Sequence, residues 1–168
     1  MKVSNEIINI CPEIKKWRHE LHAHPELGYE EEWTSNFVAE KLESFGLEVH
    51  RGMATTGVVG VLKGANASLG GGGNKAIGLR ADMDALPMTE ENDFSYRSKF
   101  DGRMHACGHD GHTAMLLGAA KLLSLKKDFD GTVYFIFQPA EEGGGGGLTM
   151  IEDGLFQQFP MDLSLIHI

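Results

Sequence analysis

The chain has 168 residues, of which 24 are acidic and 15 basic, and its formal net charge is −9 at pH 7. This length allows one domain with a sizeable core. The acidic balance argues against nucleic-acid and anionic-membrane partners, because their phosphates would repel the protein.

The apolar runs and the cysteines indicate a cytoplasmic protein with no membrane partner. No apolar run approaches the roughly 18 residues that cross a bilayer, and the N-terminus lacks the long apolar core of a signal peptide. We therefore expect Cys11 and Cys107 to be reduced rather than joined by a disulfide.

Two helices are predicted at the start of the chain. The first ends near His22, has Pro12 near its start, and carries apolar residues at the spacing of one helix face: Ile7, Ile10, Ile14, Trp17 and Leu21. The second covers residues 31–45 and stops at Gly46. Three histidines of this region are interpreted as solvated or satisfied within the core, not as metal ligands: His19, His22 and His24.

Two strands, residues 47–51 and 57–63, are expected to lie side by side across a short turn. Residues 64–74, with four consecutive glycines, predict a flexible loop. A phosphate-binding loop is disfavoured there, because Lys75 is followed by Ala76 rather than by Ser or Thr.

A third strand, residues 75–81, places Asp82 and Asp84 at its C-terminal end. Sites in open α/β sheets are built at such strand ends, and residues two apart in an extended chain point to the same side. The alternative is a turn in which Asp84 caps nearby N–H groups, and both interpretations stay open. Residues 90–102 are polar and predict a surface loop.

Residues 104–113 (MHACGHDGHT) concentrate chemistry-bearing side chains in ten positions. Cys107 and His109 are two apart, so both can point the same way, and a thiolate with an imidazole is a ligand pair for Zn²⁺ or a related divalent metal. The alternative is a thiol nucleophile paired with a histidine. His105 and His112 are interpreted as structural support.

A buried helix is predicted after Thr113, and its N-terminal N–H groups would favour a Cys107 thiolate. A central strand, residues 131–137, ends at Pro139 and leads to the adjacent Glu141 and Glu142. Adjacent carboxylates cannot aim at one point, so one can bind a metal while the other acts on water. This pair argues against a cysteine nucleophile, which has no use for it.

A short helix, residues 148–152, completes the predicted elements. Strands that alternate with helices predict an α/β fold, a three-layer sandwich around a mixed, largely parallel sheet. Four segments, in this order and spacing, resemble the metal-dependent amidohydrolase family of hippurate hydrolase, which includes N-acyl-amino-acid and auxin-conjugate amidohydrolases: RHELHAHPELGYEE (18–31), LRADMDALPM (79–88), MHACGHDGHT (104–113) and FQPAEEGGGG (137–146).

The resemblance implies a zinc-exopeptidase-like fold and hydrolysis of the amide bond of a small N-acyl amino acid by water held between two divalent metal ions, which could be Zn²⁺, Mn²⁺, Co²⁺ or Ni²⁺. It implies that Cys107 bridges the metals, that His109 and Glu142 are ligands, and that Glu141 is the general base and acid. Asp84 resembles a residue that orients a ligand. Asp82 stands where related metallopeptidases have a ligand histidine, so it is not assigned to the metal.

The C-terminus departs from the family pattern. A strand ending in Gly-Leu-His-Asn, whose histidine binds metal, is expected after Asp162, but the chain reads LSLIHI. His167 is either that ligand, displaced by one position, or part of an aberrant end. We therefore expect residues 1–168 to be the N-terminal portion of a catalytic domain that is incomplete at its C-terminus and lacks the inserted dimerisation domain of full-length homodimers or tetramers.

Such a portion would leave a sheet edge and apolar surface uncovered, which predicts marginal stability and self-association. Two alternatives to an active amidohydrolase stay open. One is a catalytically inactive metal-binding fragment, and the other is a metal-free oligomerising module.

Overall fold

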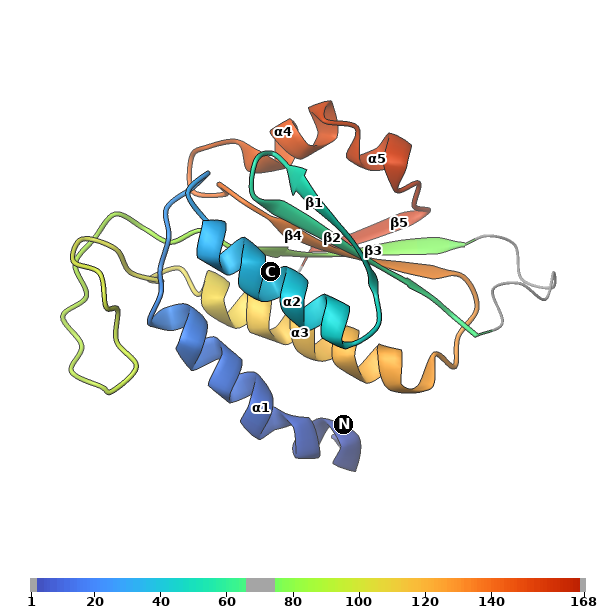
Figure 1. The fold of residues 1–168 in the computed structure, drawn as a ribbon, viewed down its shortest axis with the longest axis horizontal. Helices are drawn as coiled ribbons and strands as arrows, with labels where there is room; N and C mark the ends of the chain where they lie inside the picture. Colours follow the sequence, from blue (N-terminus) through green and yellow to red (C-terminus); the bar gives the residue numbers. More distant parts are fainter. Residues whose placement is uncertain (1–2, 66–74, 167–168) are drawn as a thin grey trace.

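The computed structural model describes residues 3–65 and 75–166, in which five strands form one sheet (Figure 1). The elements, in chain order, are α1 (Asn5–His22), α2 (Glu32–Ser44), β1 (Glu48–Met53), β2 (Gly57–Lys63), β3 (Ala76–Asp82), α3 (His109–Lys126), β4 (Thr132–Gln138), α4 (Gly146–Glu152), α5 (Leu155–Gln158) and β5 (Leu163–Ile166). Most of the predicted loop at 64–74 lies outside the described residues. No described helix has the length and apolar character needed to cross a membrane.

The sheet is mixed and has the strand order β1-β2-β4-β3-β5. Strand β2 pairs antiparallel with both β1 and β4, whereas β3 pairs parallel with both β4 and β5. Helices α4 and α5 lie on one face of the sheet, and α2 and α3 lie on the other with α1 packed on α3 (Figure 1). The predicted three-layer α/β fold with a mixed sheet is confirmed.

Helix α1 begins after Ser4, whose side chain accepts a hydrogen bond from the Ile7 N–H at 3.4 Å. The predicted helix is confirmed, with two differences. Ile7 is 42% exposed, so the buried stripe begins only at Ile10. Pro12 lies inside the helix, not near its start, because the helix begins at Asn5.

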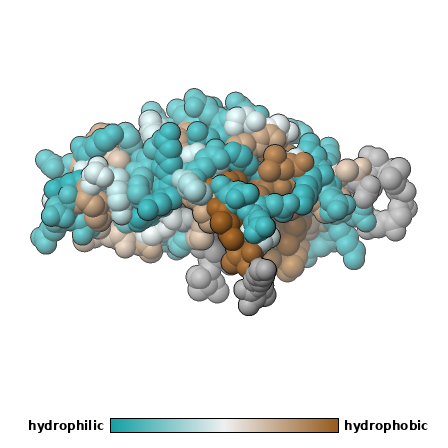
Figure 2. Space-filling model, turned by 90° about the horizontal axis from the view of Figure 1, so that it is seen from below, coloured by the Kyte–Doolittle hydropathy of each residue, from teal (hydrophilic) through white to brown (hydrophobic). Residues whose placement is uncertain are grey.

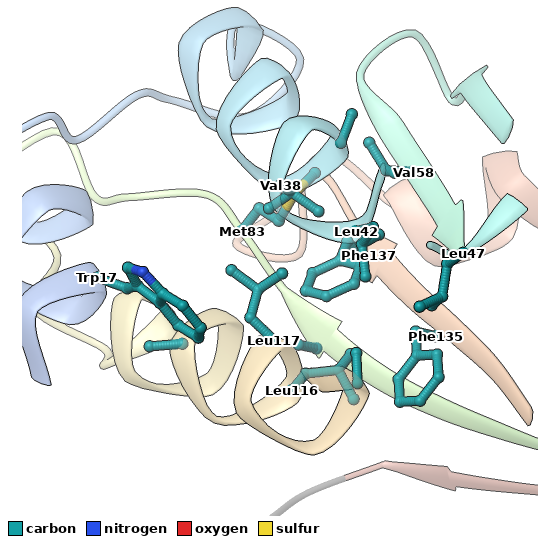
Figure 3. Close-up of a cluster of buried hydrophobic side chains, with 14 of the residues drawn as sticks. Trp17, Val38, Leu42, Leu47, Val58, Met83, Leu116, Leu117, Phe135 and Phe137 are labelled. Carbon is teal, nitrogen blue, oxygen red and sulfur yellow. The ribbon is translucent and has the colours of Figure 1, made fainter. Parts of the chain in front are cut away.

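The main core lies between the sheet and helices α1 to α3 (Figure 3). Phe135 and Phe137 of the central strand β4 point into this core and meet Leu117 of α3 and Leu42 of α2. Ile136, which alternates with them, points to the opposite face, where α4 and α5 cover it. Both faces of β4 are thus buried, as predicted for a central strand.

The parallel pair β3 and β4 brings two strand ends to one edge of the sheet, because Asp82 is the register partner of Gln138. Helix α3 connects these strands in the chain and is packed against β3. The loop predicted at 90–102 is not wholly on the surface. Glu90 is buried and bonds His22, which is also buried.

Residues 163–166 form β5, which pairs with β3 alone among the described strands. Leu163 and Leu165 are about half exposed there. On the side of α1 and α3, Figure 2 shows hydrophobic surface gathered within a largely hydrophilic face, and Ile8 and Leu125 are exposed members of these two helices. Apolar surface is therefore uncovered in the described residues, whereas self-association stays a prediction.

Candidate metal centre

Three segments meet at the edge where β3 and β4 end. Asp82 ends β3 and Asp84 follows it, Cys107 and His109 stand at the start of α3, and residues 140–142 follow β4. Gly108 caps α3 with φ +102°, a left-handed conformation that glycine adopts without strain. The helix therefore begins at His109, earlier than predicted, and its first residue is a candidate ligand.

His109 is 2% exposed and is held by Asp84. Its Nδ1 lies 2.9 Å from the Asp84 carbonyl oxygen and 3.2 Å from Asp84 Oδ1. Because a carbonyl oxygen only accepts, Nδ1 carries the hydrogen, and Nε2 has the lone pair that a metal requires. Burial lowers the pKa of His109, but the Asp84 hydrogen bond and the charge of Asp82 outweigh it, so the pKa is raised.

Cys107, His109 and Glu142 each offer one ligand atom, and these atoms lie within 4.8 Å of one another. A thiolate, an imidazole and a carboxylate form a donor set that fits Zn²⁺ and related divalent metals. The observed geometry therefore fits the ligand set that the resemblance implies.

The predicted lowering of the Cys107 pKa by the helix N-terminus is wrong for the metal-free chain. The hydrogen bond with Glu142, burial and the neighbouring carboxylates raise the pKa of Cys107 to about 11. These carboxylates outweigh the helix, so the metal-free thiol is protonated at neutral pH. A divalent cation would reverse this balance, because a coordinated thiol loses its proton. Cys107 and Cys11 are both free, as predicted, and both are exposed.

Glu141 and Glu142 both approach the same histidine nitrogen. Glu142 Oε1 lies 3.8 Å and Glu141 Oε2 lies 3.9 Å from His109 Nε2. The side chain of Glu141 is 42% exposed and that of Glu142 is 27% exposed, so Glu141 is the more open to solvent. Asp84 Oδ2 accepts a hydrogen bond from the Glu142 N–H at 2.9 Å.

Asp84 thus contacts both segments that carry candidate ligands, which agrees with the orienting role that the resemblance implies. Burial raises the pKa of Asp84, but hydrogen bonds from His109 and from the backbone of Glu142 outweigh it and lower the pKa. The carboxyl is ionised at neutral pH and accepts hydrogen bonds on both oxygens.

A second group, Asp82, His109 and His112, also brings ligand atoms within 4.8 Å of one another. Arg80 Nη1 donates to Asp82 Oδ2 at 2.9 Å, and His112 Nδ1 lies 2.7 Å from Asp82 Oδ1. The Arg80 guanidinium thus pairs with one oxygen of Asp82 and His112 with the other. The sequence interpretation missed this grouping, although the three-residue spacing of His109 and His112 on one helix indicates a shared face.

Two further histidines, His105 and His167, are not part of either group of candidate ligands among the described residues. His105 is 4% exposed, has no hydrogen-bond partner in the described part of the chain, and burial lowers its pKa to about 4. It is therefore neutral at pH 7, in keeping with structural support. His167 lies outside the described residues.

Comparison with known proteins places this site in a family. A model of peptidase family M20/M25/M40 matches residues 78–168. The hippurate hydrolase of Campylobacter jejuni is 51% identical over 162 residues, which are 96% of this chain and 40% of that protein. The N-acyl-L-amino acid amidohydrolase of Geobacillus stearothermophilus is 48% identical over 157 residues, which are 89% of this chain and 40% of that protein.

Among solved structures, the Bacillus subtilis YXEP protein, described as a dinuclear metal binding peptidase from the M20 family, matches with a TM-score of 0.81 and 38% identity. The match covers 89% of this chain and 41% of that chain. This chain spans about 40% of the length of the curated relatives it matches. The resemblance predicted from four motifs is confirmed: the family match covers more than half of the chain and includes every described residue of the candidate centre, and the chain belongs to peptidase family M20/M25/M40.

Proposed function

We propose that this chain contributes the metal-binding centre of an amidohydrolase that cleaves the amide bond of small N-acyl amino acids. The observation that carries the proposal is the convergence of Cys107, His109 and Glu142 beside Glu141. The names of the relatives from Campylobacter jejuni and Geobacillus stearothermophilus support this substrate class.

In the proposed mechanism, Cys107, His109 Nε2 and Glu142 would hold divalent metal, and Asp84 fixes the tautomer of His109. Bound metal supplies a Lewis acid and lowers the pKa of water. Glu141 accepts the proton of the attacking water and delivers it to the leaving amine. Its greater exposure and its place beside His109 support this role. Two divalent ions, of Zn²⁺, Mn²⁺, Co²⁺ or Ni²⁺, form the proposed cofactor, and the dinuclear metal binding described for the Bacillus subtilis protein supports this number.

A metal-binding chain without turnover is the second candidate. The specific observation that favours it is the sharing of His109, because the two groups of ligand atoms among the described residues have this histidine in common and so do not offer two independent sets of three. Three protein ligands serve one catalytic ion, whereas two ions need more. His167 is a proposed further ligand.

Metal content and hippurate hydrolysis, measured on the 168-residue chain and on Glu141→Gln, separate the two candidates. The variant is expected to bind as much metal as the unaltered chain and to lose about 10²- to 10⁴-fold in turnover, because it cannot accept the proton. Equal turnover by both proteins would refute the role of Glu141. Metal binding without turnover by either would select the second candidate.

A further inference from the structure

The segment that carries Glu141 and Glu142 leaves β4 through a constrained backbone. Ala140 has φ +51°, a left-handed conformation that residues with a Cβ rarely adopt. Ala140 is also fully buried. Neighbouring groups must therefore hold this conformation, since neither the residue type nor water favours it.

Glu31 provides the contact that holds Ala140. Its side chain is fully buried, immediately before α2, and Oε1 accepts a hydrogen bond from the Ala140 N–H at 2.9 Å. Oε2 accepts from Thr56 Oγ1 at 2.6 Å, in the turn between β1 and β2. Burial of a carboxyl group is costly unless its oxygens are bonded. Here one of the two bonds goes to the segment that bears the candidate catalytic pair.

Two residues close to Glu31 in the chain, Gly28 and Tyr29, also contact residues 140–144. A Cβ at Gly28 would lie 3.0 Å from Ala140 Cα, so the two backbones are in close contact. The Tyr29 hydroxyl donates to the Gly144 carbonyl at 2.6 Å. The stretch that includes Glu31 therefore holds both ends of residues 140–144, while Asp84 holds the Glu142 N–H from the other side.

We propose that Glu31 is a positioning residue for Glu141 and Glu142. Its carboxyl group accepts the Ala140 N–H and so maintains the left-handed turn that directs both carboxylates towards His109. The hydrogen bonds of the Glu31 carboxyl group go to the Ala140 N–H and the Thr56 hydroxyl, so Glu31 acts on the candidate pair through the backbone. Both measurements rest on the proposed metal centre, and the activity measurement rests in addition on the proposed hydrolysis.

The test is a Co²⁺ titration of the full chain, followed by the cobalt absorption bands, including the thiolate band that Cys107 would produce. Glu31→Ala removes the acceptor, and we expect about a 10- to 100-fold loss of Co²⁺ affinity with an altered spectrum. Glu31→Gln keeps an oxygen for Ala140 and an amide that can donate to the Thr56 hydroxyl. Its affinity and spectrum are expected to stay close to those of the unaltered chain.

Thr56→Val is the matched control, because it removes the other partner of Glu31 and leaves the Ala140 bond. It should lower the melting temperature but retain the affinity and the spectrum. The proposal is overturned if Glu31→Ala binds Co²⁺ like the unaltered chain, or if Thr56→Val loses as much affinity as Glu31→Ala. If Glu31→Ala does not fold, a tenfold loss in Glu31→Gln overturns the proposal and retained affinity supports it.

Hydrolysis provides a separate readout. If the unaltered chain hydrolyses hippurate, Glu31→Ala should lower kcat more than it changes KM, because Glu141 is misdirected while the substrate contacts remain. If the unaltered chain binds Co²⁺ but shows no turnover, the proposed hydrolysis fails, and the Co²⁺ titration still decides the role of Glu31. If the unaltered chain does not bind Co²⁺, the proposed metal centre fails and the role of Glu31 fails with it.

Discussion

Two buried carboxylates, Asp84 before α3 and Asp110 in its first turn, make hydrogen bonds near the start of this helix. Asp84 orients His109 from one side. Asp110, the next residue, accepts from Arg18 Nε at 2.8 Å and lies 2.7 Å from His22 Nδ1. His22 Nε2 lies 3.0 Å from Glu90 Oε1. Both nitrogens of His22 thus face carboxylates, an arrangement that favours the charged ring.

This network predicts a pH-dependent stability. Burial lowers the pKa of His22, but its bonds with Asp110 and Glu90 outweigh it, so the pKa in the folded state is raised. The stabilisation is therefore fully present below the unfolded-state pKa, near 6.5, and is lost as pH rises through the folded-state pKa. Arg18 and the neutral His105 also face this group.

His22→Gln should lower the free energy of unfolding at pH 6 by about 1 to 3 kcal/mol, because buried acceptors lose their partner. The difference between the variant and the unaltered chain should shrink as pH rises to 9. Urea unfolding across this range measures it. A difference that does not change with pH would contradict a charged His22.

The candidate ligands could be predicted from sequence, but several of their supports could not. Cys107, His109 and Glu142 lie in short motifs whose spacing and residue types indicate metal chemistry. Glu31 and Ala140, by contrast, are 109 residues apart, and no local pattern joins them. The pairing of Asp82 with His112 could not be predicted from the sequence either, because it depends on how α3 packs against β3.

At the scale of elements, α3 links the site to the core. Its first residue is His109, while Leu117, further along the same helix, is fully buried against Phe137 and Trp17 (Figure 3). The sequence pattern predicted that this helix starts after Thr113, because the residues before it are polar and typical of a loop. Asp82 and Asp84 satisfy those polar side chains, which allows them to lie in a buried helical turn.

Leu117→Ala should lower the free energy of unfolding by about 2 to 5 kcal/mol, because it leaves a cavity in the main core. Leu125→Ala on the same helix is the matched control, since Leu125 is 71% exposed. Its effect should stay within about 0.5 kcal/mol. Urea unfolding of the two variants measures both values, and similar losses would contradict the core assignment.

At the scale of the molecule, the polar candidate centre and the apolar edge strand β5 lie at different places on the sheet. The candidate centre lies where β3 and β4 end, while β5 presents its edge and its half-exposed leucines. A groove of about 380 Å³ runs between β5 and α3 and is lined mainly by apolar side chains: Leu79, Met115, Leu116, Ala119 and Leu165. Strand edges and apolar surface of this kind favour association.

Leu165→Lys should therefore reduce self-association of the chain, because a charge on an edge strand opposes pairing with another edge. Sedimentation velocity over a range of concentrations measures the oligomer fraction. Leu148→Lys, on the exposed side of α4, is the control and should leave it unchanged. Monomeric behaviour of the unaltered chain at every concentration would contradict the prediction.

The parallel pairing of β3 with β4 also has a consequence for how the centre comes into being. Strands β1 and β2 are neighbours in the chain and pair as a hairpin. Strands β3 and β4 also pair, but they are separated in the chain by α3 and its flanking loops. Contacts between distant segments form slowly, because the entropy of closing a long loop must be lost first. Asp84, His109 and Glu142 come from the three parts of this crossover, so we expect the candidate centre to assemble late in folding, only in chains that have completed the crossover.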